Sequence, residues 1–419
     1  MKYLDKSILY LIYFLPLALL TGPFLPDLIV SLVAIFFIST LNYNNKYIYF
    51  QSSFFKFFFI FYIYLIFSSL ISDLIFFSLK SSLVYIRFII FSLAIWYLLN
   101  TNKIFIKYFT FIFILSFLIA IIAGYYQYSF GETIFGKISR FDRLNLLLSD
   151  EQVLGHFLSR LFPLLVGLML LNFKNKLRYY LLLIFLFISI DTLVYLSGER
   201  TSLGLMLLGS VFMLIFINKF RVIRIFSIIL SFIIIILLTA TNPNIKERNI
   251  DHTINQLGLS EGSNKVYIFS KIHENFIITS GKIFLDNKFF GVGPNNFRNY
   301  CDDERYEYNK NSCSTHPHNT YIQIAAEIGI FGAIFVIILL ASLLIKFFYH
   351  LYCKIFKKYS YLSDFQICLI ACFLVTFWPL IPSLNFFNNW INIIYYLPVG
   401  FFLHSMNRSN EKINLDYKD

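Results

Sequence analysis

The sequence predicts an all-α polytopic membrane protein with about twelve transmembrane helices and one large polar loop. Hydrophobic residues make up 58% of the 419 positions and charged residues only 14%, so a soluble globule could not cover this much apolar surface. Apolar runs of about 20 residues, the length that crosses a bilayer core, recur along the chain. Lys and Arg lie in short clusters between these runs, a pattern typical of membrane orientation.

The first apolar run, from Ser7 to Leu20, follows Lys2 and Lys6 and has the outline of a signal peptide. No small-residue cleavage site follows it and further hydrophobic segments do, so we expect a retained first helix. In all, twelve segments are expected to form membrane helices. They lie near residues 7–21, 25–41, 54–72, 82–99, 107–126, 155–171, 179–196, 201–217, 225–240, 319–345, 365–381 and 391–405.

The net charge of +12 does not indicate a nucleic-acid partner, because the basic residues do not line one face. If the N-terminus is cytoplasmic, every segment on that side is positive, as the positive-inside rule requires. The basic residues on that side are Lys46, Lys56, Lys103, Lys107, Lys174, Lys176, Arg178, Lys219, Arg221, Arg224, Lys346, Lys354, Lys357, Lys358, Arg408 and Lys412. We therefore expect both termini in the cytoplasm.

This topology divides the chain into four parts. Residues 1–240 carry nine helices and an outer segment at 127–154, residues 319–405 carry three helices, and residues 406–419 form a cytoplasmic tail. The remaining part, 241–318, is the only long polar stretch, and a loop of that length between membrane helices usually carries function. The chemistry is expected there.

The large loop contains two cysteines, Cys301 and Cys313, which flank a charged, Tyr-rich stretch. They lie on the oxidising side of the membrane in this topology, so we predict a disulfide between them. The other three cysteines fall in or beside membrane helices and are interpreted as small apolar residues. No Cys/His spacing typical of zinc is present, and no metal site is expected.

The end of the loop carries the densest chemical signal, Thr315-His316-Pro317-His318-Asn319-Thr320. Thr320 and Gln323 have the spacing of a capping box, so a helix should begin there with His318 just outside it. The positive end of that helix favours bound anions and a neutral imidazole, so His318 could act as a base. His316, two residues away, is the alternative, and His252, His273 and His156 are weaker ones.

Within this helix, Ala325, Gly329 and Ala333 form a stripe of small residues. Such a stripe lets a neighbouring helix approach closely, which would fix the position of the helix start.

These residues resemble the O-antigen ligase and O-antigen polymerase superfamily of bacterial inner-membrane glycosyltransferases. The hallmark of that family is a His followed by Asn, Ser or Gln, then nine residues and Gly-x-x-Gly. His318, Asn319, Gly329 and Gly332 fit that spacing. The stretch 290–297, with Gly291 and Gly293, and the corner 197–202, which resembles the family's Ser-Arg-small corner, extend the likeness to roughly residues 190–340.

The resemblance implies transfer of a polysaccharide from an undecaprenyl diphosphate carrier to an acceptor hydroxyl, such as that of the lipid A core. The reaction would take place on the periplasmic side of the inner membrane, without a metal ion or other cofactor. His318 would take the proton of the poor sugar nucleophile. Arg200, at the mouth of a membrane helix, is the first candidate to bind the diphosphate. The alternative for Arg200 is an anchor that snorkels to the interface.

The family also places a second arginine in the large loop, and here the sequence offers no clean match. Several residues are therefore candidates for binding diphosphate or sugar, including the amide that follows the histidine. These candidates are Arg298, Asn319, Arg140, Arg143, Arg160 and Lys265.

Four functions remain open at this point. We favour the ligase, because the His motif is stronger in that branch of the family. A polymerase would use the same donor but a lipid-linked repeat unit as acceptor, and a protein glycosyltransferase would share the architecture. A transporter could also have twelve helices, but it should show paired half-repeats and broken midplane helices, which the sequence does not indicate.

Overall fold

The computed structural model describes residues 2–138, 143–148, 151–173, 177–217, 219–260 and 265–416. Within these ranges the chain forms helices joined by loops, and the only β pairing is an isolated bridge between Glu132 and Ile138. The all-α fold class predicted from the sequence is therefore confirmed.

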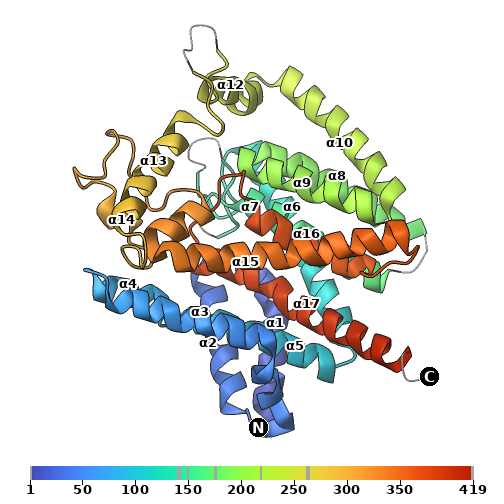
Figure 1. Ribbon diagram of the computed structural model, residues 1–419. Helices are drawn as coiled ribbons and strands as arrows, with labels where there is room; N and C mark the ends of the chain where they lie inside the picture. Colours follow the sequence, from blue (N-terminus) through green and yellow to red (C-terminus); the bar gives the residue numbers. More distant parts are fainter. Residues whose placement is uncertain are drawn as a thin grey trace.

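The helices of the first half of the chain form most of the bundle drawn in blue to green in Figure 1. They are α1 (Lys2–Ala18), α2 (Phe24–Ser39), α3 (Ser53–Leu70), α4 (Ile75–Ser82), α5 (Ile86–Thr101), α6 (Phe105–Phe130), α7 (Leu154–Asn172), α8 (Leu177–Leu196) and α9 (Arg200–Phe216), with 3₁₀ turns η1 (Leu19–Thr21) and η2 (Tyr43–Gln51).

The second half begins with α10, which leads away from the bundle to a group of shorter helices (Figure 1). The elements are α10 (Arg221–Thr241), α11 (Pro243–Lys246), the π-helical turn η3 (Glu247–Asp251), α12 (His252–Gln256), α13 (Lys271–Asp286), α14 (Phe297–Tyr300), α15 (Thr320–Phe356), α16 (Asp364–Phe377) and α17 (Asn389–Asp416). The predicted polar loop is thus partly helical. Residues 242–260 and 265–319 lie together with residues 378–388 at one end of the bundle, which we call the loop face.

Each of the twelve predicted segments coincides with a helix. Among the residues that the structure describes, eight helical spans are long and apolar enough to cross a bilayer, and α2, α9 and α16 are shorter apolar helices. The chain is therefore a multi-pass membrane protein, while the number of crossings stays a prediction. Several boundaries were wrong. The helix predicted over 365–381 ends at Phe377, because Pro379 lacks the N–H that would continue it, whereas the helices predicted to end at 345 and 405 continue to Phe356 and Asp416.

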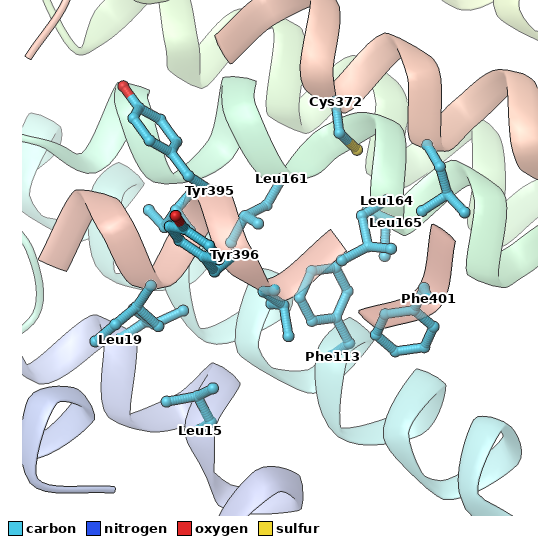
Figure 2. Close-up of a cluster of buried hydrophobic side chains, with 14 of the residues drawn as sticks. Leu15, Leu19, Phe113, Leu161, Leu164, Leu165, Cys372, Tyr395, Tyr396 and Phe401 are labelled. Atoms are coloured by element: carbon cyan, nitrogen blue, oxygen red, sulfur yellow. The ribbon is translucent and has the colours of Figure 1, made fainter. Parts of the chain in front are cut away.

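The core of the bundle is built around α7. Within its membrane-spanning window 94% of the residues are buried, against 17% in α10 and 22% in α15, so α7 is central whereas α10 and α15 face lipid. Figure 2 shows Phe113 of α6, Leu164 of α7, Cys372 of α16 and Phe401 of α17 meeting in this core. Such close packing holds the ends of α7, α16 and α17 in fixed positions.

One charge expected in an inner loop lies inside the bundle instead. Arg224, near the start of α10, donates two hydrogen bonds to the carboxylate of Asp191 in α8, at 2.6 and 2.8 Å. Its guanidinium also donates to Ser210 of α9 and lies over the ring of Phe162. A charge that is paired with a carboxylate is tolerated in a bundle interior, so Arg224 joins three helices rather than marking the cytoplasmic side.

Candidate active site

The helix that follows the histidine motif begins where the sequence predicts. The side chain of Asn319 accepts the backbone N–H groups of Tyr321 and Ile322, at 3.1 and 3.2 Å, and so caps α15. The predicted capping box of Thr320 and Gln323 is wrong: the Thr320 hydroxyl donates to Ser383 at 2.8 Å. Asn caps a helix as well as Thr does. The cap of α15 is therefore Asn319, one residue before Thr320.

His318 lies immediately before this cap, with a backbone φ of +55°. The left-handed region is uncommon for residues other than glycine, and such conformations concentrate at functional sites. The residue is held there by its carbonyl oxygen, which accepts the backbone N–H of Ser383 at 2.8 Å.

Three histidines gather at this point of the loop face. The ring of His318 lies with its centroid 4.0 Å from that of His316 and 5.3 Å from that of His273 in α13. The ring of Phe276, one turn along α13, stacks on His318 at 5.5 Å. The sequence ranked His273 below the other two, and only the folding of α13 onto the start of α15 brings it into the cluster.

The segment 378–388, which the sequence treated partly as helix, fixes the histidine motif from the other side. Its carbonyl groups at Ser383 and Pro379 accept hydrogen bonds from His316 Nε2 at 3.3 Å and from Asn319 Nδ2 at 3.0 Å. Two prolines within this segment, at 379 and 382, were the available signal that the helix ends.

Burial, together with smaller electrostatic contributions from His316, His273 and Arg143, lowers the pKa of His318 to about 2. Burial likewise lowers the pKa of His316 to about 4, with a smaller contribution from Arg298. Both imidazoles are therefore neutral at physiological pH in the resting protein, as a base must be.

The Gly-Val-Gly-Pro stretch docks against α15 directly behind this cluster. The backbone N–H of Gly293 donates to the Glu327 carbonyl at 2.7 Å. The buried Glu327 carboxylate in turn accepts the backbone N–H groups of Asn295 and Phe297, both at 3.0 Å. The loop and the helix thus form one hydrogen-bonded unit.

This docking explains the glycines of the motif. Gly329 has a φ of +73°, and a Cβ there would lie 2.1 Å from the Phe289 carbonyl oxygen. A Cβ on Gly291 would lie 2.3 Å from the backbone of Glu327. The prediction that small residues admit a neighbouring helix at Gly329 was wrong, since the loop backbone approaches there. A Cβ on Gly332 would lie 2.3 Å from the Ile328 side chain, so the glycine leaves room for that side chain.

The structure joins Cys301 and Cys313 by a disulfide. Within the described ranges, the one group of possible metal ligands is these two cysteines with Asp302. Cysteines in a disulfide offer no thiolate to a metal ion, so this group does not fit a metal site.

Arg200 is positioned by the corner that precedes α9. The carboxylate of Glu199 accepts the backbone N–H groups of Gly155 and His156, at 2.8 and 3.1 Å, and so caps α7. Burial raises the pKa of this carboxyl to about 7. The guanidinium of Arg200 donates to Thr253 at 3.1 Å and to Gln256 of α12.

Only some of the predicted cations lie near the histidine cluster. Arg143 acts electrostatically on His318 and His273, Arg200 on His273, and Arg298 on His316, so these three lie near the histidine cluster. Lys265 is exposed and its charge is neutralised in an ion pair with Glu274. The others are Arg140, which lies outside the described residues, and Arg160, which is buried in α7 and donates to the Val375 carbonyl at 3.2 Å.

The three histidines of the cluster, Arg200, Arg298, the docked glycine loop and the cap of α15 fall within one stretch of sequence, whereas Arg143 precedes it. Residues 181–337 match the O-antigen ligase family. No curated protein sequence matches the chain. The O-antigen ligase match includes Arg200, Gly291, His318 and Gly332, so the family resemblance inferred from the sequence is confirmed over this region. It supports an activity of the ligase or polymerase kind, and it ends near the middle of α15.

Proposed function

We propose that the protein is an O-antigen ligase-like glycosyltransferase, which moves a glycan from undecaprenyl diphosphate to an acceptor hydroxyl, such as that of the lipid A core. The observation that carries this proposal is the neutral His318 at the start of α15, inside the family-matched region, with Arg143, Arg200 and Arg298 near its cluster. A base and fixed cations are what this transfer requires.

In this proposal His318 takes the proton of the acceptor hydroxyl while that oxygen bonds to the first sugar carbon of the donor. The bond from this carbon to the diphosphate breaks, and its electron pair stays on the diphosphate oxygen. Negative charge grows on the leaving group, and arginines stabilise it because they stay charged and bind phosphate oxygens in pairs. A bound diphosphate also offsets the positive charges that disfavour the protonated imidazole.

An apolar cavity of about 450 Å³ supports a lipid-linked donor. Its lining runs from Phe386 and Tyr395, near the loop face, to Phe54 and Lys346, toward the opposite end of the bundle. A cavity that follows the membrane depth and is lined almost wholly by apolar and aromatic side chains suits a polyprenyl chain. The lipid would then enter beside α15, which faces the bilayer.

We further propose that the loop face is periplasmic, that both termini are cytoplasmic, and that the protein resides in the bacterial inner membrane. The basic residues between helices support this orientation. An alkaline phosphatase fusion within residues 265–270 should be active and a fusion after residue 358 inactive. The reverse result would exclude a periplasmic site.

Fixed arginines already supply the positive charge that a metal ion would provide, so we propose a reaction without metal or cofactor. Treatment of the purified protein with a chelator should leave the transfer rate unchanged. A loss of activity that one divalent ion restores would contradict this part of the proposal.

The decisive experiment is glycan analysis of a strain that lacks this protein. A ligase predicts accumulation of long lipid-linked polymer, and reintroduction of the wild-type chain should clear it. Accumulation of single lipid-linked repeats would identify a polymerase instead. An unchanged glycan profile on both lipid and acceptor would reject glycan transfer altogether.

A further inference from the structure

Three polar side chains share one face of α7. His156, Ser159 and Arg160 stand at positions i, i+3 and i+4 of the helix, and so lie close together. Their exposed fractions are 8%, 1% and 2%. Each has a buried polar atom without a hydrogen-bond partner, namely Nδ1 of His156, Oγ of Ser159 and Nε of Arg160. Buried polar atoms in proteins are nearly always bonded, so this face is built to receive a polar ligand.

The charge of Arg160 determines which ligand the face selects. Among the described residues no carboxylate pairs with Arg160; its guanidinium donates to the Val375 carbonyl at 3.2 Å and lies 5.4 Å from the ring of Tyr395. A buried charge without a counter-ion is costly. The face is therefore complementary to an anion.

The position of Arg160 links this face to the histidine cluster. Val375 lies near the end of α16 and Pro379 lies two residues past that end, and their carbonyls accept hydrogen bonds from Arg160 and from Asn319, at 3.2 and 3.0 Å. Both side chains are thus held by the same short stretch of chain, residues 375–379.

Tyr395 links the same face to the apolar cavity. Its ring lies against Arg160 and also lines the cavity, and its hydroxyl is another buried polar atom without a partner. A ligand that occupies both places must carry an anionic group on a long apolar chain.

We propose that Ser159, Arg160 and Tyr395 form a subsite that holds the diphosphate of the lipid-linked donor, so that α7 and α17 bind the leaving group together with the arginines near the histidine cluster. This inference rests on the proposed glycan transfer for the identity of the donor. Ser159 Oγ, Arg160 Nε and the Tyr395 hydroxyl donate hydrogen bonds to diphosphate oxygens. These bonds strengthen as the sugar–oxygen bond breaks and its electron pair moves to the diphosphate.

The test measures the binding of two probes, inorganic diphosphate and farnesyl diphosphate, to the purified full-length protein in detergent. Binding is measured by titration calorimetry. Ser159→Ala and Tyr395→Phe each remove one donor with little change in packing, and we expect each to weaken binding about tenfold. Arg160→Lys keeps a charge but loses the planar guanidinium that can bond two oxygens, and we expect it to weaken binding about a hundredfold. The matched control is Ser116→Ala, since Ser116 is also buried in a membrane helix but donates to its own backbone.

If the wild type and the variants at Ser159, Arg160 and Tyr395 bind with equal affinity, the subsite is overturned. A loss of affinity in Ser116→Ala as large as in these variants would overturn it as well. Tighter binding of farnesyl diphosphate than of inorganic diphosphate supports a lipid-linked ligand, whereas equal affinities would show a site for free diphosphate and overturn the donor assignment. His318→Ala should bind both probes normally yet transfer no glycan. A wild-type protein that binds the probes but whose absence leaves cellular glycans unchanged would reject the transfer while retaining the subsite.

Discussion

The rings of His316 and His318 lie with their centroids only 4.0 Å apart, yet their hydrogen bonding differs. Both ring nitrogens of His316 are engaged, Nδ1 by the Thr315 hydroxyl at 3.0 Å and Nε2 by the Ser383 carbonyl at 3.3 Å. No side chain or backbone group among the described residues is hydrogen-bonded to the ring of His318. His316 therefore supports the motif, and His318 is the imidazole that is available to a substrate.

Replacement of His318 by Ala should reduce glycan transfer by at least about a hundredfold without loss of protein, because a positioned base contributes on that scale. His316→Ala should reduce transfer less and lower thermal stability. His252→Ala is the control, since that side chain is half exposed in α12. Transfer is measured with purified lipid-linked donor, and retention of wild-type rates in His318→Ala would remove its role as base.

Arg200→Lys should impair transfer about tenfold or more. A lysine keeps the charge, but its single amine cannot bond Thr253 and Gln256 and at the same time bind two phosphate oxygens. Arg305→Lys, an exposed residue paired with Asp303 in the loop, provides the matched control. Equal rates for the two variants would make Arg200 an interfacial anchor. Rates and membrane levels should be measured together.

Gly329→Ala should destabilise the protein severely, since the new Cβ would meet the Phe289 carbonyl at 2.1 Å and the residue has a φ of +73°. Gly281→Ala in α13 should be neutral or slightly stabilising, because no atom lies within 4 Å of that Cβ. The comparison uses thermal unfolding in the same detergent. Similar unfolding temperatures for the two variants would show that α15 can straighten at Gly329.

Stability should fall as the pH drops below about 6.5. The folded pKa of His316 is lowered to about 4 and that of His318 to about 2, so the unfolded chain binds protons that the folded chain does not. Each histidine costs at most about 1.4 kcal/mol per pH unit within its window. We expect His316→Gln to flatten the decline of unfolding temperature between pH 6.5 and 4. Identical slopes in variant and wild type would contradict this.

The double substitution Cys301→Ser and Cys313→Ser should lower the free energy of unfolding by about 3 kcal/mol, the entropy of closing a short loop. The effect should appear as a lower unfolding temperature of the loop face and faster proteolysis between residues 302 and 312. Reduction of the wild type should reproduce it. An unchanged protease pattern in both cases would mean that the disulfide does not order this segment.

Much of the fold follows from the sequence because the apolar runs are long and the breaks between them are charged. The twelve predicted segments coincide with helices, and the start of α15 lies at the predicted residue. The motif around His318 was found because its residues are close together in sequence. Arg143 was one of several candidate cations, and only the structure places it near the cluster.

The remainder depends on contacts between distant parts of the chain. Nothing near Ser383 in the sequence indicates that its backbone would hold His316 and His318. Two partners of the Glu327 carboxylate are backbone groups 30 and 32 residues away, which carry no side-chain signal. Ser159 is an ordinary serine within an apolar run, and only its burial without a partner distinguishes it.

The interruption at Gly329 has a further consequence for the enzyme in a living membrane. The N–H of Ile330 donates to the Lys288 carbonyl rather than continuing the helix, so residues 320–328 belong mechanically to the loop and residues 330–356 to the bilayer. Changes of lipid thickness tilt long helices. We expect that tilt to be absorbed at Gly329, so that the histidines keep their alignment in membranes of differing composition.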